Sequence, residues 1–76
     1  MNSIDKRSKD ELIKIAVAGG GFVLDAESKA QEDLVAIAGA ASHEGATLVL
    51  RNASRKTTDD MVEIAFASKG SVIFSD

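Results

Sequence analysis

A nine-residue pattern occurs three times in this chain, and it constrains the fold more than any other feature. It consists of two acidic residues, a long apolar residue, a β-branched residue, any residue, Ile-Ala, any residue and Ala. The three copies occupy residues 10–18, 32–40 and 59–67. Repetition of this kind indicates that one structural unit is used several times. We therefore expect a single domain, residues 1–76, made of three units at approximately 8–27, 30–54 and 57–76.

Each copy has the features of an amphipathic helix. Its apolar residues recur at helical spacing, which places Leu12, Ile15 and Ala16, for example, on one face. The acidic pairs fall in the first helical turn, where they meet the positive end of the helix dipole. The positions where an N-cap is expected before the copies hold Ser8, Ala30 or Ser28, and Thr57. Ser8 with Glu11, and Ser28 with Gln31, have the spacing of a capping box.

A glycine and then a short apolar run follow each copy of the pattern. The runs are residues 22–24, 47–50 and 71–74. Their β-branched content favours strands, and consecutive apolar positions fit strands buried on both faces, as in parallel sheets. Strands joined by helices run parallel, and the crossovers are expected to be right-handed. The prediction is an α/β fold with a small three-stranded parallel sheet.

Two strand orders are compatible with this prediction. The order 1-2-3 puts the helices mainly on one side and gives a short right-handed α/β solenoid. The order 2-1-3 puts helices on both faces. Similar units favour the first order, because each unit then stacks on its neighbour in the same way.

One strand and the residues after it resemble a known repeat family. The stretch Leu48-Val49-Leu50-Arg51-Asn52, followed by a helical segment, is similar to the Leu-x-Leu-x-x-Asn stretch of leucine-rich repeats. This resemblance implies a role in binding or scaffolding rather than in catalysis.

Composition excludes several classes of function. The chain has no Cys, which excludes disulfides and thiolate metal sites. A net charge of −3 and the absence of Trp and Tyr argue against nucleic-acid binding. The longest mostly apolar run, residues 13–24, is too short to cross a membrane and contains Lys14. No secretory signal is recognisable, so a cytoplasmic location is predicted, without cofactor or metal.

The segment after the second strand is a candidate anion-binding or nucleotide-binding loop. It lies between the carboxyl end of a strand and the start of a helix, where ligands tend to bind in open α/β sheets. The residues that would bind the anion are Arg51, Asn52, Arg55, Lys56, Thr57 and Thr58. Because Asp59 and Asp60 follow directly, a self-neutralised, solvated loop is the favoured interpretation.

Other apparent sites have structural explanations. Gly19–Gly21 follow a helix, whereas phosphate loops precede one, so they are interpreted as a turn and helix cap. The acidic pairs are explained by the helix dipole without a metal ion. Ser42, His43 and Glu44 are neighbours in sequence, which does not make them a catalytic triad. No catalytic residues are assigned.

A sheet covered on one side leaves an apolar far face and two unpaired edges. We therefore expect homo-oligomerisation, most simply as a dimer. The residues expected to mediate it are Leu48, Val49, Leu50, Val72, Ile73 and Phe74. The leading functional prediction is a small non-enzymatic module for protein interaction or self-assembly, and the anion-binding loop is the alternative.

Overall fold

Helices and strands alternate along the chain. The computed structural model describes residues 4–76. The helices are α1 (Lys9–Val17), α2 (Gln31–Glu44) and α3 (Thr58–Ser68), and the strands are β1 (Phe22–Asp25), β2 (Leu48–Arg51) and β3 (Val72–Phe74). Three short 3-10 turns are η1 (Ile4–Lys6), η2 (Ala26–Ser28) and η3 (Ala53–Arg55).

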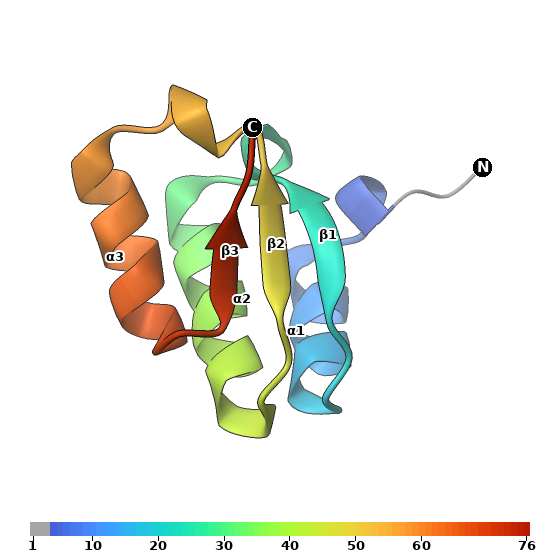
Figure 1. Cartoon of the computed structure of the whole chain (residues 1–76). Helices are drawn as coiled ribbons and strands as arrows, with labels where there is room; N and C mark the ends of the chain where they lie inside the picture. The colour runs from blue at the N-terminus through green and yellow to red at the C-terminus, as the bar shows by residue number, and fades with distance from the viewer. Residues whose placement is uncertain (1–3) are drawn as a thin grey trace.

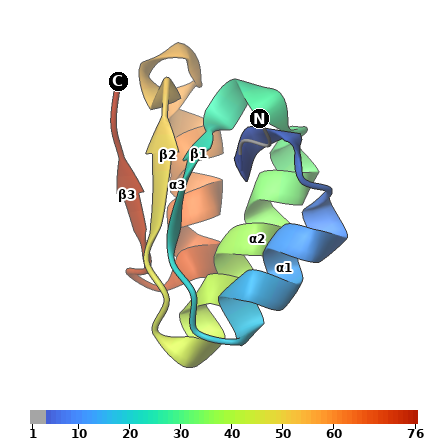
Figure 2. The same ribbon diagram turned by 90° about the vertical axis from the view of Figure 1, so that its right-hand side faces the viewer.

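The strands form one parallel sheet in the order β1-β2-β3 (Figure 1). This confirms the α/β prediction and excludes the order 2-1-3. The three helices lie on one side of the sheet, and the other side is open (Figure 2). The molecule therefore has two layers, a helix layer and a sheet layer.

Only one face of the strands is covered. Leu24, Leu48 and Leu50 are fully buried under the helices. Their neighbour Val23 is 48% exposed, and Ile73 on β3 is 54% exposed. The expectation that the strands are buried on both faces is therefore wrong. Because successive side chains of a strand point to opposite faces of the sheet, the helices cover every second residue and leave the others open to solvent.

The main core lies between the sheet and the inner faces of the helices. Leu12 of α1, Leu34 and Ile37 of α2, and Ile64 of α3 are fully buried there with the strand leucines. Burial of each such side chain contributes about 1.5–3 kcal/mol. A second cluster consists of small residues between α1, α2 and the turn after α2: Ala16, Ala40, Ala41 and Ala46.

Two of the helix starts are capped as the sequence predicts. The Ser8 hydroxyl accepts a hydrogen bond from the Glu11 amide at 3.2 Å, and the Glu11 carboxylate accepts one from the Ser8 amide at 3.1 Å. Thr57 accepts one from the Asp60 amide at 3.1 Å. At α2 the N-cap is Ala30, which has no side-chain cap.

The predicted capping box of Ser28 and Gln31 does not form. Residues 26–28 make the turn η2 instead, and the Ser28 hydroxyl donates to the Asp25 carbonyl at 2.6 Å. Ser28 is thereby held two residues before the N-cap Ala30.

Replacing Ala30 with serine should stabilise the protein by about 0.5–2 kcal/mol. The Ala30 backbone (φ −66°, ψ 155°) matches that of Ser8 (φ −69°, ψ 160°), so a serine hydroxyl would reach the Asp33 amide, which otherwise bonds only the Ala30 carbonyl at 3.0 Å. Urea denaturation followed by circular dichroism measures the change. Ser8→Ala is the matched control and should lower stability by a similar amount, and an unchanged midpoint in Ala30→Ser would contradict the assignment.

Candidate functional site

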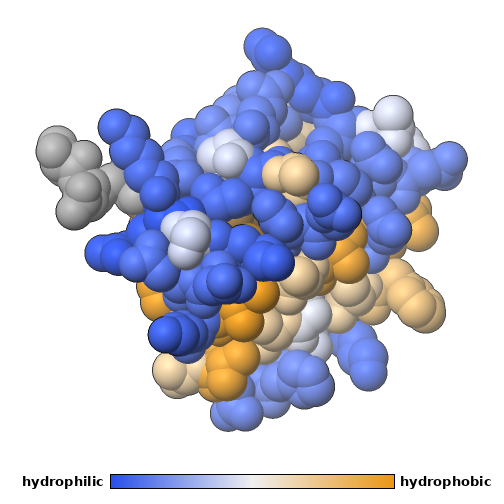
Figure 3. Space-filling view, turned by 180° about the vertical axis from the view of Figure 1, so that it is seen from behind, coloured by the Kyte–Doolittle hydropathy of each residue, from blue (hydrophilic) through white to orange (hydrophobic). Residues whose placement is uncertain are grey.

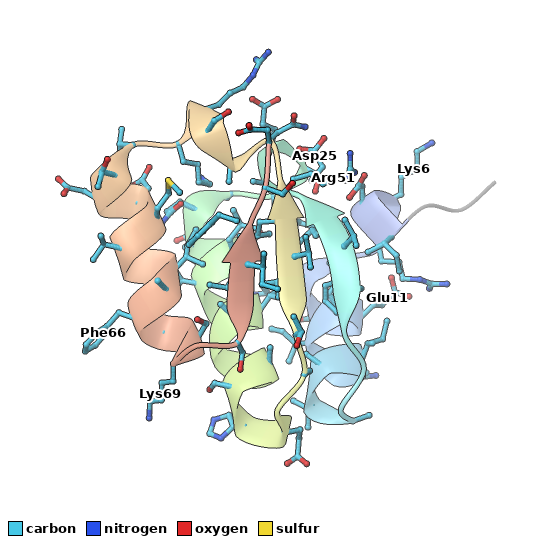
Figure 4. The ribbon with its side chains drawn as sticks, in the orientation of Figure 1. Lys6, Glu11, Asp25, Arg51, Phe66 and Lys69 are labelled. Carbon is cyan, nitrogen blue, oxygen red and sulfur yellow. The ribbon has the colours of Figure 1, made fainter. Side chains whose placement is uncertain are left out.

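A polar cluster surrounds Asp5 at the end of the sheet where the strands finish. The Asp5 carboxylate accepts a hydrogen bond from the Asp25 amide at 2.7 Å and pairs with the Arg51 guanidinium at 2.7 Å. The Lys29 ammonium donates to the Asp5 carbonyl at 2.7 Å. These contacts hold η1 against the outer edge of β1, and Figure 4 shows Asp25 and Arg51 together at the strand ends.

The other cations of the predicted anion-binding loop also have partners within the chain. Arg55 pairs with Glu27 at 3.4 Å, and the Lys56 ammonium donates to the Gln31 side-chain oxygen at 2.8 Å. Together with the Arg51–Asp5 pair, these contacts direct the three cations to three different partners. They do not converge on one position where an anion would sit.

The remaining polar residues of the loop are in use or exposed. The Thr57 hydroxyl caps α3, Thr58 begins that helix at the surface, and Asn52 has a left-handed backbone with φ 61°. The loop is therefore organised by contacts within the chain.

Hydrogen bonds from the Asn52 side chain and the Glu27 amide hold the pKa of the Asp25 carboxyl below its ordinary value of 3.8. Partial burial opposes this effect, and the nearby guanidinium groups of Arg51 and Arg55 reinforce it. The Asp25 carboxylate thus joins the end of β1 to Asn52, which lies between β2 and η3.

Asp25 should make the stability depend on pH in the acid range. Its pKa is lower in the folded state than in the unfolded state, so the charged form stabilises the fold at pH values above 3.8. This contribution is lost as the pH falls through the folded pKa. A carboxyl-carbon NMR titration should place the Asp25 midpoint below 3.8. An Asp25→Asn variant should lose part of the acid-induced destabilisation, and a midpoint at or above the ordinary value would contradict the assignment.

An apolar row crosses the open face of the sheet. Val23, Val49 and Ile73 are register partners on the three adjacent strands. Val49, on the middle strand, is half-buried between its two exposed neighbours. Val49 and Ile73 are thus the two predicted self-association residues that lie on this face.

The other four predicted self-association residues face the helix layer. Leu48 and Leu50 are fully buried in the core. Val72 and Phe74 are partly buried and pack against it. They support the sheet from within and do not belong to its open face.

A second exposed apolar surface, which is not among the sequence predictions, lies on α3. Phe66 is 84% exposed and Val62 is 59% exposed. Figure 4 shows Phe66 pointing outward from α3 on the side away from α2. Seen from the helix side, hydrophobic side chains gather in the lower half, whereas the end where the strands finish is hydrophilic (Figure 3). In the sequence, this surface is indicated by the apolar pair Val62 and Phe66, which are four residues apart and lie outside the helix positions that face the core.

A surface cavity of about 410 Å³ lies where β3 ends beside α3. Its lining residues are Ala53, Ser54, Met61, Phe74, Ser75 and Asp76. This lining combines three apolar side chains with two serine hydroxyls and one carboxylate side chain, and it contains no cation.

The remaining sequence candidates lie in structural positions. Gly19 has a φ of 95° directly after α1, and His43 is exposed in the last turn of α2. Among residues 4–76 there is no group of three or more His, Cys, Asp or Glu side chains placed to hold a metal ion. No helix in this part of the chain is long and apolar enough to cross a membrane.

Comparisons with protein-family models, with curated proteins and with solved structures give no match for this chain.

Proposed function

We propose that this chain is a small non-enzymatic module that self-associates through the open face of its sheet. The observation that carries the proposal is the apolar row of Val23, Val49 and Ile73, which lies in register across all three strands. Two of these side chains are about half exposed, so a second copy that covered them would remove apolar surface from water.

In the same proposal the three helix–strand units form a short right-handed α/β solenoid, similar to leucine-rich repeats. The strand order, the helices on one side and the shared nine-residue pattern support this interpretation. A solenoid of three units presents its sheet face as a binding surface, which fits a role in protein interaction.

One two-fold arrangement brings the apolar rows together without contact between like charges. If the axis runs across the strands, each row lies on its own counterpart. The flanking Arg51 then faces Thr47 of the partner subunit, and Asp25 faces Gly21 of the partner subunit. If the axis runs along the strands, Arg51 meets the partner's Arg51, which is unfavourable. The charges beside the row therefore favour the first arrangement.

The contact is small, so the dimer is expected to be weak. Three strands spaced about 4.8 Å apart give a narrow apolar patch, below the roughly 1,200 Å² that a standard interface buries. We expect a dissociation constant of about 10 μM to 1 mM.

The replacement Val49→Lys tests the proposal, because it puts a charge at the centre of the row. In the wild type, the amide NMR signals of Val23, Val49 and Ile73 should shift as the concentration rises toward about 1 mM. In Val49→Lys the corresponding signals should become independent of concentration, while the circular dichroism is unchanged. Ala36→Lys, which places the same charge on the exposed side of α2, is the matched control. Concentration-dependent shifts that persist in Val49→Lys would contradict the proposal.

A further inference from the structure

Four exposed side chains form a line along the outer side of α3 and its C-cap. They are Asp59, Val62, Phe66 and Lys69. The opposite side of the helix is committed to the core, where Ile64 and Ser68 are fully buried. We call the four outer residues the α3 seam. Within the described part of the chain, neither of its two charged side chains has an ion-pair partner.

The spacing of the α3 seam is that of a helix-pairing surface. Successive members are three, four and three residues apart, which is the spacing of alternating a and d positions in a coiled coil. Such positions lie along one stripe and meet the equivalent stripe of a second helix. Val62 and Phe66 form the apolar centre, and the two charges lie at its ends.

The seam is also symmetric about Ile64. Val62 and Phe66 lie two residues on either side of it, and Asp59 and Lys69 lie five residues on either side. A two-fold axis at the level of Ile64 therefore places Phe66 against Val62 of the partner subunit. The same axis places Lys69 against Asp59 of the partner subunit, and each contact occurs twice.

We propose that a second copy of this chain docks on the α3 seam, with the two α3 helices antiparallel. In this orientation apolar side chains of one copy contact apolar side chains of the other, and each cation faces an anion. The two helix dipoles are then antiparallel, which is also favourable. In a parallel pair Asp59 would meet the partner's Asp59, and Lys69 would meet the partner's Lys69, so the charges specify the antiparallel pair.

The α3 seam is separate from the open sheet face, and this proposal does not rest on the proposed function. α3 has 11 residues and is about 16 Å long, so this contact is also small and the dimer weak. With both surfaces in use, each copy would contact two different neighbours. Assembly would then continue beyond a dimer as the concentration rises.

A charge-exchange experiment tests the α3 seam, and all variants in it also carry Val49→Lys so that the sheet face is inactive. Lys69→Glu sets acid against acid across the two-fold axis, and Asp59→Lys sets cation against cation. Each variant alone should bind itself at least about ten-fold more weakly than the parent. In an equimolar mixture every acid meets a cation, so sedimentation equilibrium should show the dimer restored. Added salt of about 0.5 M should weaken the restored dimer.

Phe66→Ala tests the apolar centre independently of charge. Phe66 is largely exposed, so this variant should remain folded, and its average molecular mass should no longer rise with concentration. Val17→Ala, at an exposed valine on α1, is the matched control, and its average molecular mass should still rise with concentration.

The outcomes separate the two proposals. A mixture no heavier than its components, or a parent that keeps the mass of one chain up to about 1 mM, would overturn the α3 seam and leave the sheet face untouched. Concentration-dependent shifts at Phe66 without shifts at Val23 would support the α3 seam and contradict the sheet face.

Discussion

Replacing Leu50 with alanine is expected to lower the free energy of unfolding by about 2–5 kcal/mol. Leu50 lies on the central strand, is fully buried, and belongs to the main core together with Leu24 and Ile37. A chain of 76 residues has a total stability of about 4–11 kcal/mol, so this one change removes a large part of it. Urea denaturation followed by circular dichroism measures the loss.

Val49→Ala is the matched control for Leu50→Ala. Val49 is the preceding residue on the same strand, but its side chain lies on the open face. Because no core cavity forms there, the variant should lose less than about 1 kcal/mol. Equal losses at the two positions would contradict the observed register, since a shift by one residue exchanges the two faces of a strand.

Replacing Gly21 with alanine should also destabilise the protein strongly, by about 1–3 kcal/mol or more. A methyl group at Gly21 would lie 2.5 Å from the Thr47 carbonyl oxygen, which belongs to the backbone leading into β2. The same oxygen accepts a hydrogen bond from the Phe22 amide at 3.2 Å. Relief of the clash would therefore move the two strands apart where their pairing begins. Thermal denaturation measures the cost.

Gly39→Ala should have the opposite effect. Gly39 lies inside α2, and a methyl group there would meet no atom within 4 Å. Alanine has the higher helix propensity, so the variant should gain about 0.5–1 kcal/mol. A neutral Gly21→Ala variant, or a destabilised Gly39→Ala variant, would show that these glycines have other roles.

The glycines illustrate how far local sequence information reaches. The sequence predicts a turn and helix cap at Gly19–Gly21, and the φ of 95° at Gly19 agrees with that prediction. Gly21 is needed for a different reason, the close approach of the segment before β2, which is distant in sequence. The spacing of residues along the chain does not predict such a contact, because the contact forms only when the strands pair.

The candidate surfaces show the same division. The apolar strand runs predict Val49 and Ile73, but they predict the buried Leu48 and Leu50 equally. No pattern in the sequence indicates Asp5, although this residue joins η1 to Arg51, 46 positions further along the chain. The outer and inner sides of α3 both carry apolar residues, so the sequence does not distinguish them.

The order and type of the elements follow from the amino-acid sequence alone. These depend on signals within a few residues, such as the capping box of Ser8 and Glu11 and the helical spacing of the nine-residue pattern. Which face of each strand is buried, and which side of α3 remains free, depends on tertiary packing. The strands are apolar on both faces, so periodicity cannot tell the faces apart. The choice was made when the three helices packed on one side of the sheet.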